Sequence, residues 1–261
     1  MQNDPIFFIP VFIFGCVIGS FLNVVILRLP APGESIAFPA SHCPHCKTEL
    51  SWYENIPLFS YLFLWGKCRH CGITISLQYP IVELSTGLMA VSNLAVFGLS
   101  AAALIFFFFS AALITIIWID IHHQIIPDVI SKPGIILGFL FSFLSPITTW
   151  QDSLIGLVFG FGIFFAISST YKLVRGQEGL GGGDTKLLSM LGAFLGWQSL
   201  LFIIFASSLT GTIAGLIAMP VQKKGGNTRI AFGPFLAISG FIYLFFHEQI
   251  HQLFQLYLNA W

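Results

Sequence analysis

The feature that most constrains this chain is a series of long apolar segments separated by short polar breaks. A helix needs roughly 20 apolar residues to cross the hydrocarbon core of a bilayer. Such segments occupy 6–28, 81–98, 101–119, 132–147, 153–173, 186–197, 199–219 and 231–250. Only 8% of the residues are charged, whereas soluble domains carry about a quarter. We therefore predict an all-α polytopic membrane protein with about eight transmembrane helices embedded in the lipid bilayer.

The basic residues predict the orientation of these helices. Loops rich in Lys and Arg favour the cytoplasmic side. With eight spans, all eleven Lys and Arg fall on one side: Arg28, Lys47, Lys67, Arg69, Lys132, Lys172, Arg175, Lys186, Lys223, Lys224 and Arg229. The N-terminus lacks a basic region and a cleavage site, so we interpret it as a retained first span. We expect an outward N-terminus and a cytoplasmic insert at 29–80. The net charge of zero gives no electrostatic support for nucleic-acid binding.

Several predicted helices carry glycines four residues apart. This spacing lets helix backbones approach closely in lipid, although glycine is also simply common in membrane helices. The pairs are Gly15/Gly19, Gly156/Gly160, Gly192/Gly196 and Gly211/Gly215.

Four acids lie at or near the predicted spans, where a carboxylate is costly and suggests function. Asp120 ends the run "LITIIWID", and Asp184 opens the run "TKLLSMLGAFLG". Both fall at cytoplasmic helix ends, so they can meet in the folded bundle. Glu83 and Asp128 are interpreted as interfacial or structural acids.

The segment after Asp184 is unusually short. With a turn near Gly196, the first crossing has about 12 residues, or roughly 18 Å, against a hydrocarbon core of about 30 Å. We therefore predict that the glycine loop before Asp184 dips into the membrane plane, where irregular backbone has to line a protected or watery cavity.

Two carboxylates in one cavity can hydrolyse a peptide bond. They hold one proton between them, because both do not ionise cheaply. One carboxylate activates a water, and the protonated one polarises the scissile carbonyl. Asp184 precedes a helix and Asp120 ends one. From the helix dipoles alone, we therefore hypothesise that Asp184 is the ionised base and Asp120 holds the proton.

The insert contains two C-x-x-C pairs separated by 21 residues. They are Cys43 with Cys46 and Cys68 with Cys71. This spacing resembles that of zinc ribbons, and four thiolates satisfy a tetrahedral zinc. The alternatives are a pair of disulfides or four free thiols, and the cytoplasmic side favours reduced thiols.

Two other functions fit parts of the sequence. Residues 247–251 read "HEQIH", which matches the H-E-x-x-H zinc-protease motif. That motif falls at the outer end of the last helix, opposite the aspartates. Membrane acids and broken helices also occur in ion-coupled transporters, but no convincing repeat relates the two halves. His122 and His123 after Asp120 are interpreted as interfacial or loop residues rather than metal ligands.

Several motifs together resemble the type IV prepilin peptidase / N-methyltransferase family of GxGD membrane aspartyl proteases. They are "GGGD" at 181–184, "IDIHHQIIPD" at 119–128, the cysteine insert with "SHCPHC", and "FGPFLA" at 232–237. The resemblance covers nearly the whole chain. Presenilin-like enzymes share GxGD but generally have Tyr-Asp where this chain has Ile119-Asp120.

The resemblance implies a bifunctional enzyme of the bacterial inner membrane. It would cleave the basic leader from prepilins and pseudopilins at the cytoplasmic face, then methylate the new N-terminus with S-adenosylmethionine. Such enzymes serve type IV pili and type II secretion. Asp120 and Asp184 would be the catalytic pair, and Gly181, Gly183 and Lys186 would support the loop.

The expected organisation is a first helix at 1–28, a methylation-associated cysteine insert at 29–80 and a protease domain at 81–261. The residues that bind S-adenosylmethionine cannot be assigned from the sequence, because the insert has no glycine fingerprint.

Overall fold

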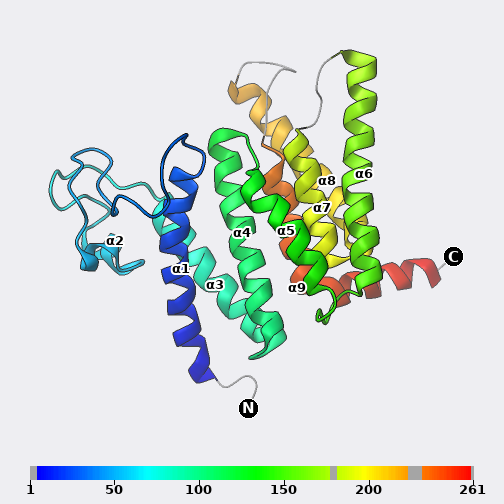
Figure 1. Ribbon diagram of the computed structural model, residues 1–261, viewed down its shortest axis with the longest axis horizontal. Helices are drawn as coiled ribbons and strands as arrows, with labels where there is room; N and C mark the ends of the chain where they lie inside the picture. Colours follow the sequence, from blue (N-terminus) through cyan, green and yellow to red (C-terminus); the bar gives the residue numbers. More distant parts are fainter. Residues whose placement is uncertain (1–4, 177–180, 223–230, 260–261) are drawn as a thin grey trace. The chain divides into compact units, whose positions relative to one another are not determined.

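The computed structural model describes residues 5–176, 181–222 and 231–259, and its regular structure is helical (Figure 1). The α-helices are α1 (Phe8–Arg28), α2 (Phe59–Phe63), α3 (Gln78–Phe97), α4 (Ala101–His123), α5 (Asp128–Phe141), α6 (Trp150–Arg175), α7 (Gly182–Leu195), α8 (Trp197–Gln222) and α9 (Gly233–Asn259). Each predicted apolar segment forms a helix, so the all-α prediction is confirmed. Asp4, the loop residues 178–180, and Lys223, Lys224 and Arg229 lie outside the described residues.

Five of these helices are long and apolar enough to cross a membrane: α1, α3, α4, α6 and α8. The protein is therefore a multi-pass membrane protein. Helix α7 has 14 residues, ends at Leu195, and is followed by Gly196 at φ 83° before α8 begins. At about 1.5 Å per residue, α7 is about 21 Å long, which is short of the hydrocarbon core. The predicted short helix is confirmed, and the depth of Asp184 in the bilayer stays a prediction.

Helix α5 differs from its predicted segment, 132–147, at both ends. It begins at Asp128, directly after Pro127, and ends at Phe141. The N–H of Ser142 reaches the carbonyls of both Gly138 and Phe139. Pro146 then disfavours helical backbone at the residue before it. The apolar residues beyond Phe141 lie in the connection to α6.

The chain forms two compact units, Met1–Thr115 and Ile116–Trp261. In the first unit, α1 packs along α3. A Cβ on Gly15 would lie 2.8 Å from the Cα of Gly87, and one on Gly19 would lie 2.7 Å from the Cα of Glu83. Real Cβ atoms do not approach other atoms so closely. The predicted role of Gly15 and Gly19 in close helix packing is confirmed.

In the second unit, α7 packs against α5, α6, α8 and α9, and most of its side chains are buried. The backbones of α6 and α7 touch where a Cβ on Gly192 would lie 2.3 Å from the carbonyl oxygen of Gly156. Two hydroxyls join the same helices: Ser153 donates to the Ala193 carbonyl at 2.6 Å, and Ser189 donates to the Leu157 carbonyl at 2.9 Å. Helix α7 is therefore a rigid base for the residues at its start.

Candidate functional site

Asp120 lies in the last turn of α4, and its side chain is buried, with 5% exposed. Its Oδ2 accepts a hydrogen bond of 2.9 Å from the backbone N–H of Gly233, the first residue of α9. A Cβ on Gly233 would lie 2.6 Å from the same oxygen. The contact between the ends of α4 and α9 therefore requires glycine at position 233.

Asp184 lies in the first turn of α7 and is half-buried. Its backbone N–H bonds to the carbonyl of Gly181 at 3.1 Å. A Cβ on Gly181 would lie 3.3 Å from Oδ2 of Asp184, and one on Gly183 would lie 2.9 Å from the Cβ of Ile126. Both glycines of the loop thus allow close packing, Gly181 around the acid and Gly183 against the segment between α4 and α5.

One cavity of about 270 Å³ contains both acids. Its lining residues come from the end of α4, the connection from α4 to α5, and the start of α7 with the residue before it: Asp120, Gln124, Ile125, Ile126, Gly181, Gly182, Gly183, Asp184 and Lys186. Ligand pockets span about 300–1,000 Å³, so this cavity is slightly smaller than a typical ligand pocket. Two carboxyl groups on one small cavity can share a proton and a water.

Lys186 also lines this cavity, but its ammonium group is paired. Its Nζ lies 2.5 Å from Oδ1 of Asp128, and Nζ of Lys132 lies 2.7 Å from the other oxygen. Hydrogen bonds from Lys132 and then from Lys186 hold the pKa of the Asp128 carboxyl below its usual value. Asp128, the first residue of α5, thus ties the start of α5 to Lys186, the fifth residue of α7.

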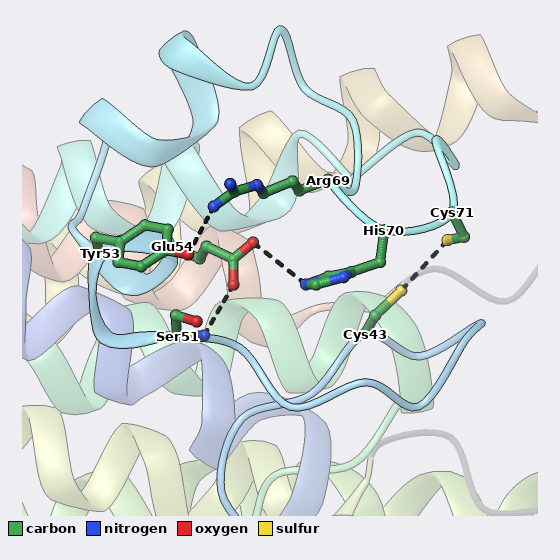
Figure 2. Close-up of polar contacts among 7 residues, drawn as sticks. All are labelled: Cys43, Ser51, Tyr53, Glu54, Arg69, His70 and Cys71. Carbon is green, nitrogen blue, oxygen red and sulfur yellow. Dashed lines mark hydrogen bonds and ion pairs between the residues drawn. The ribbon is translucent and has the colours of Figure 1, made fainter.

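The four cysteines of the insert gather into one cluster, in which all four sulfur atoms lie within 4.8 Å of one another. The sulfurs of Cys43 and Cys71 are 3.9 Å apart (Figure 2). Four ligands at about 2.3 Å from a tetrahedral zinc would be about 3.8 Å from each other. The cluster therefore fits a single metal ion of that size, and the cysteines are free of disulfides.

The two C-x-x-C turns have the same backbone design. The carbonyl of Cys43 accepts from Lys47 N–H, and the carbonyl of Cys68 accepts from Gly72 N–H, both at 2.9 Å. Lys47 and Gly72 both have positive φ, at 57° and 71°. Such paired turns present their sulfurs to a common point.

Two of the histidines beside the cysteines, His42 and His70, have other partners. His70 Nε2 lies 3.7 Å from Oε1 of Glu54, whose other oxygen accepts from the Ser51 N–H at 2.8 Å (Figure 2). His42 Nδ1 lies 3.2 Å from the carbonyl of Ala40. In the described part of the chain, the group that could hold a metal ion here consists of the four cysteine sulfurs.

The "HEQIH" motif lies in α9, beyond a kink at Phe246. His251 Nε2 is 2.9 Å from the hydroxyl of Tyr243, and His247 Nδ1 is 3.2 Å from the Leu244 carbonyl. In the part of the chain that the structure describes, no third metal ligand joins them. The motif begins 14 residues after Gly233, or about 21 Å along a helix, so it is remote from the two aspartates. His122 is likewise bonded locally, to the Trp118 carbonyl at 2.8 Å.

The residue that sequence reasoning missed is Gly233. It belongs to the "FGPFLA" stretch at 232–237, which carries part of the family resemblance. A Gly-Pro pair directly before an apolar run was the available signal, because proline suits the first helical turn and glycine permits a close approach.

Comparisons with known proteins cover most of the chain. Residues 13–97 match the family model of the bacterial peptidase A24 N-terminal domain, and residues 107–216 match that of the type IV leader peptidase family. A prepilin leader peptidase/N-methyltransferase of Stutzerimonas stutzeri is 37% identical over 95% of this chain and 94% of its own length. The protein of the same name from Pseudomonas aeruginosa is 39% identical over 90% of this chain and 89% of its own length. The one from Aeromonas hydrophila is 35% identical over 94% of this chain and 92% of its own length. No solved structure matches.

Proposed function

The chain belongs to the type IV leader peptidase family, and from this premise we propose that it is a membrane aspartic endopeptidase for prepilins and pseudopilins. It cleaves the basic leader peptide and then methylates the new N-terminus. The observation that carries the peptidase assignment is the common cavity of Asp120 and Asp184 at the meeting point of α4, α7 and α9. We propose these two aspartates as the catalytic pair, with Gly181 and Gly183 shaping the loop and Lys186 fixing it through Asp128.

The contact of Gly233 bears on which aspartate is ionised in the resting enzyme. A hydrogen bond donated to a carboxylate favours its charged form, and the N-terminus of α9 adds the positive end of a helix dipole. From the dipoles of their own helices alone, the anion was predicted on Asp184, but the donor to Asp120 comes from a third helix, α9. We assign the resting anion to Asp120 and the proton to Asp184.

Hydrolysis then proceeds through a water held between the two acids. Asp120 takes a proton from the water as its oxygen attacks the scissile carbonyl carbon, and Asp184 gives its proton to the carbonyl oxygen. The tetrahedral intermediate collapses when Asp120 passes its proton to the amide nitrogen and the C–N bond breaks. A hydroxyl proton of the intermediate returns to Asp184, so both acids regain their starting states without an acyl-enzyme.

The location follows from the distribution of charge. With the eight predicted spans, the basic residues fall in loops and at helix ends on one side, which favours the cytoplasm for that side. We propose a multi-pass protein of the bacterial inner membrane with its active site at the cytoplasmic face. The apolar helix of a prepilin would lie in the bilayer beside the enzyme, and its basic leader would stay at the cytoplasmic surface.

We keep the functional division into a first helix at 1–28, an insert at 29–80 and a protease domain at 81–261. The insert serves methylation, with S-adenosylmethionine supplying the methyl group. The four cysteines, Cys43, Cys46, Cys68 and Cys71, would hold a structural zinc, which crosslinks two turns of a segment too small for a large apolar core.

The test is co-expression of the full chain with a prepilin, followed by the size and N-terminal mass of the product. Loss of the leader and gain of one methyl group report both activities in one spectrum. Asp120→Asn and Asp184→Asn should each abolish cleavage, because an amide neither activates the water nor donates a carboxyl proton. Glu248→Gln in the "HEQIH" motif is the matched control and should leave cleavage intact. Cleavage by either Asn variant would refute the proposal, and its loss in Glu248→Gln would favour the metalloprotease.

A further inference from the structure

The insert turns its aromatic side chains outward. Five large apolar side chains between Trp52 and Trp65 are strongly exposed, and Trp52, Phe63 and Trp65 are 80%, 79% and 88% exposed. We call the five the aromatic patch: Trp52, Phe59, Leu62, Phe63 and Trp65. They belong to α2, the turn that follows it and the 3-10 helix Trp52–Asn55.

The one acid within this segment is buried instead. Glu54 is buried, and its carboxylate accepts from the Ser51 N–H and faces His70. A water-facing module would bury the aromatics and expose the acid. Contiguous exposed apolar surface on a folded protein marks contact with a partner or a membrane. This segment is therefore built to face an apolar or interfacial environment.

A hydrogen bond sets the level of the patch along α3. The backbone N–H of Leu58, directly before α2, donates to Oε2 of Glu83 at 2.8 Å. Glu83 is buried in the second turn of α3, five residues after Gln78, or about 8 Å along the helix. In Figure 1, α2 is level with the upper half of α1, not beyond its end. Helices α1 and α3 are both candidate membrane spans. The segment that carries the aromatic patch therefore returns toward the bilayer, to the depth of the polar headgroup layer. That layer is about 5–8 Å thick on each side of the bilayer.

The chemistry of the patch matches that layer. Tryptophan concentrates at membrane–water interfaces, because its ring is apolar and its N–H bonds to polar groups. Lys67 and Arg69 are exposed close to Trp65, and the Arg69 guanidinium lies 5.5 Å from the centre of the Tyr53 ring. Basic groups beside apolar aromatics are typical of surfaces that lie on anionic bilayers.

We propose that the aromatic patch is seated in the headgroup layer of the bilayer, which makes the insert a peripheral membrane module hinged between α1 and α3. Glu83 acts as the positioning residue that holds the start of α2 at this depth. The aromatic patch keeps the insert at the membrane face where α1 ends and α3 begins. The proposal does not depend on the peptidase assignment.

Tryptophan quenching in vesicles tests the proposal. The full chain is reconstituted in phosphatidylglycerol-containing vesicles whose lipids carry bromine either close to the headgroup or close to the end of the acyl chain. The chain has six tryptophans, so the difference in emission between the wild type and W52Y/W65Y isolates the two in the patch. We expect this difference to be quenched more by the shallow bromines than by the deep ones, and little by iodide in the water.

Two results would overturn the proposal. Quenching by iodide without quenching by bromine would place the patch in water. Quenching by neither would mean that protein covers it, either another part of this chain or a second copy.

A second measurement does not depend on the tyrosine variants. Phe63→Asp/Trp65→Asp should expose the insert to protease in the same vesicles and raise its cleavage rate about tenfold, because docking strength scales with buried apolar area and charge is excluded from the acyl boundary. Ile73→Asp, at a half-exposed apolar residue of the insert outside the patch, is the matched control and should leave the rate unchanged. Equal rates of protease cleavage in the wild type, Phe63→Asp/Trp65→Asp and Ile73→Asp would refute the docked state.

Discussion

Replacing Gly233 by alanine tests the link between α9 and Asp120. The new Cβ would lie 2.6 Å from Oδ2 of Asp120 and 3.2 Å from its Cγ. Since carbon and oxygen do not pack at 2.6 Å, the carboxylate or the start of α9 has to move by several tenths of an ångström. That movement breaks or lengthens the 2.9 Å hydrogen bond from the Gly233 N–H.

The loss follows from the chemistry of that bond. A hydrogen bond to a charged group contributes about 1.5–3 kcal/mol, and about 1.36 kcal/mol in the barrier is a factor of ten in rate. We therefore expect kcat for prepilin cleavage to fall by about 10- to 150-fold. KM should change little, because Gly233 is not among the residues that line the cavity.

The measurement is steady-state cleavage of a purified prepilin, with the pH profile of kcat as a second readout. If the Gly233 N–H stabilises the anion of Asp120, the acidic limb of the profile should move to higher pH in Gly233→Ala. Gly162→Ala is the matched control, because Gly162 is a helical glycine of α6 and an added Cβ would meet no atom within 4 Å. A kcat for Gly233→Ala within twofold of the Gly162→Ala value, with the same pH profile, would refute the positioning role.

Three further predictions concern stability. Gly192→Ala should lower the free energy of unfolding by about 1–3 kcal/mol, because its Cβ would meet the Gly156 carbonyl oxygen; an unchanged thermal midpoint in detergent would contradict this. The folded pKa of Asp128 is depressed, so its contribution to stability should be full above the unfolded pKa of about 3.9 and disappear as the pH falls below it. Asp128→Asn should therefore lower the thermal midpoint at pH 7. The same variant should change the thermal midpoint little at the most acidic pH that the protein tolerates. Cys43→Ser or removal of metal by a chelator should expose the insert to protease, because Cys43 belongs to the four-sulfur cluster; identical digestion before and after chelation would speak against a structural metal.

The helices were predictable because each depends on a local pattern. Apolar runs and helix-breaking residues are close in sequence, so the short α7 and the turn at Gly196 could be read directly. The glycine pairs of α1 and α6 were equally readable, since a four-residue spacing puts both glycines on one helix face. The end of α5 was not predictable from hydropathy, because the residues after Phe141 are apolar but belong to a connection.

The candidate site shows where local reasoning stops. The acids and the glycine loop were visible as motifs, since each motif spans a few residues. The donor to Asp120 was not, because Gly233 is 113 positions away along the chain and nothing near Asp120 indicates its partner. The dipoles of α4 and α7 could be predicted from sequence, whereas the contribution of α9 depends on how the helices pack.

The sequence alone determined that this chain is a helical membrane protein, which residues are its candidate acids and metal ligands, and that α7 is short. Each of these depends on composition or on spacing within a few turns. Only the tertiary structure decided that α4, α7 and α9 bring Asp120, Asp184 and Gly233 together, and that the insert exposes its aromatics while burying Glu54. Such contacts depend on how helices pack on one another, and packing is a property of whole surfaces rather than of any single segment.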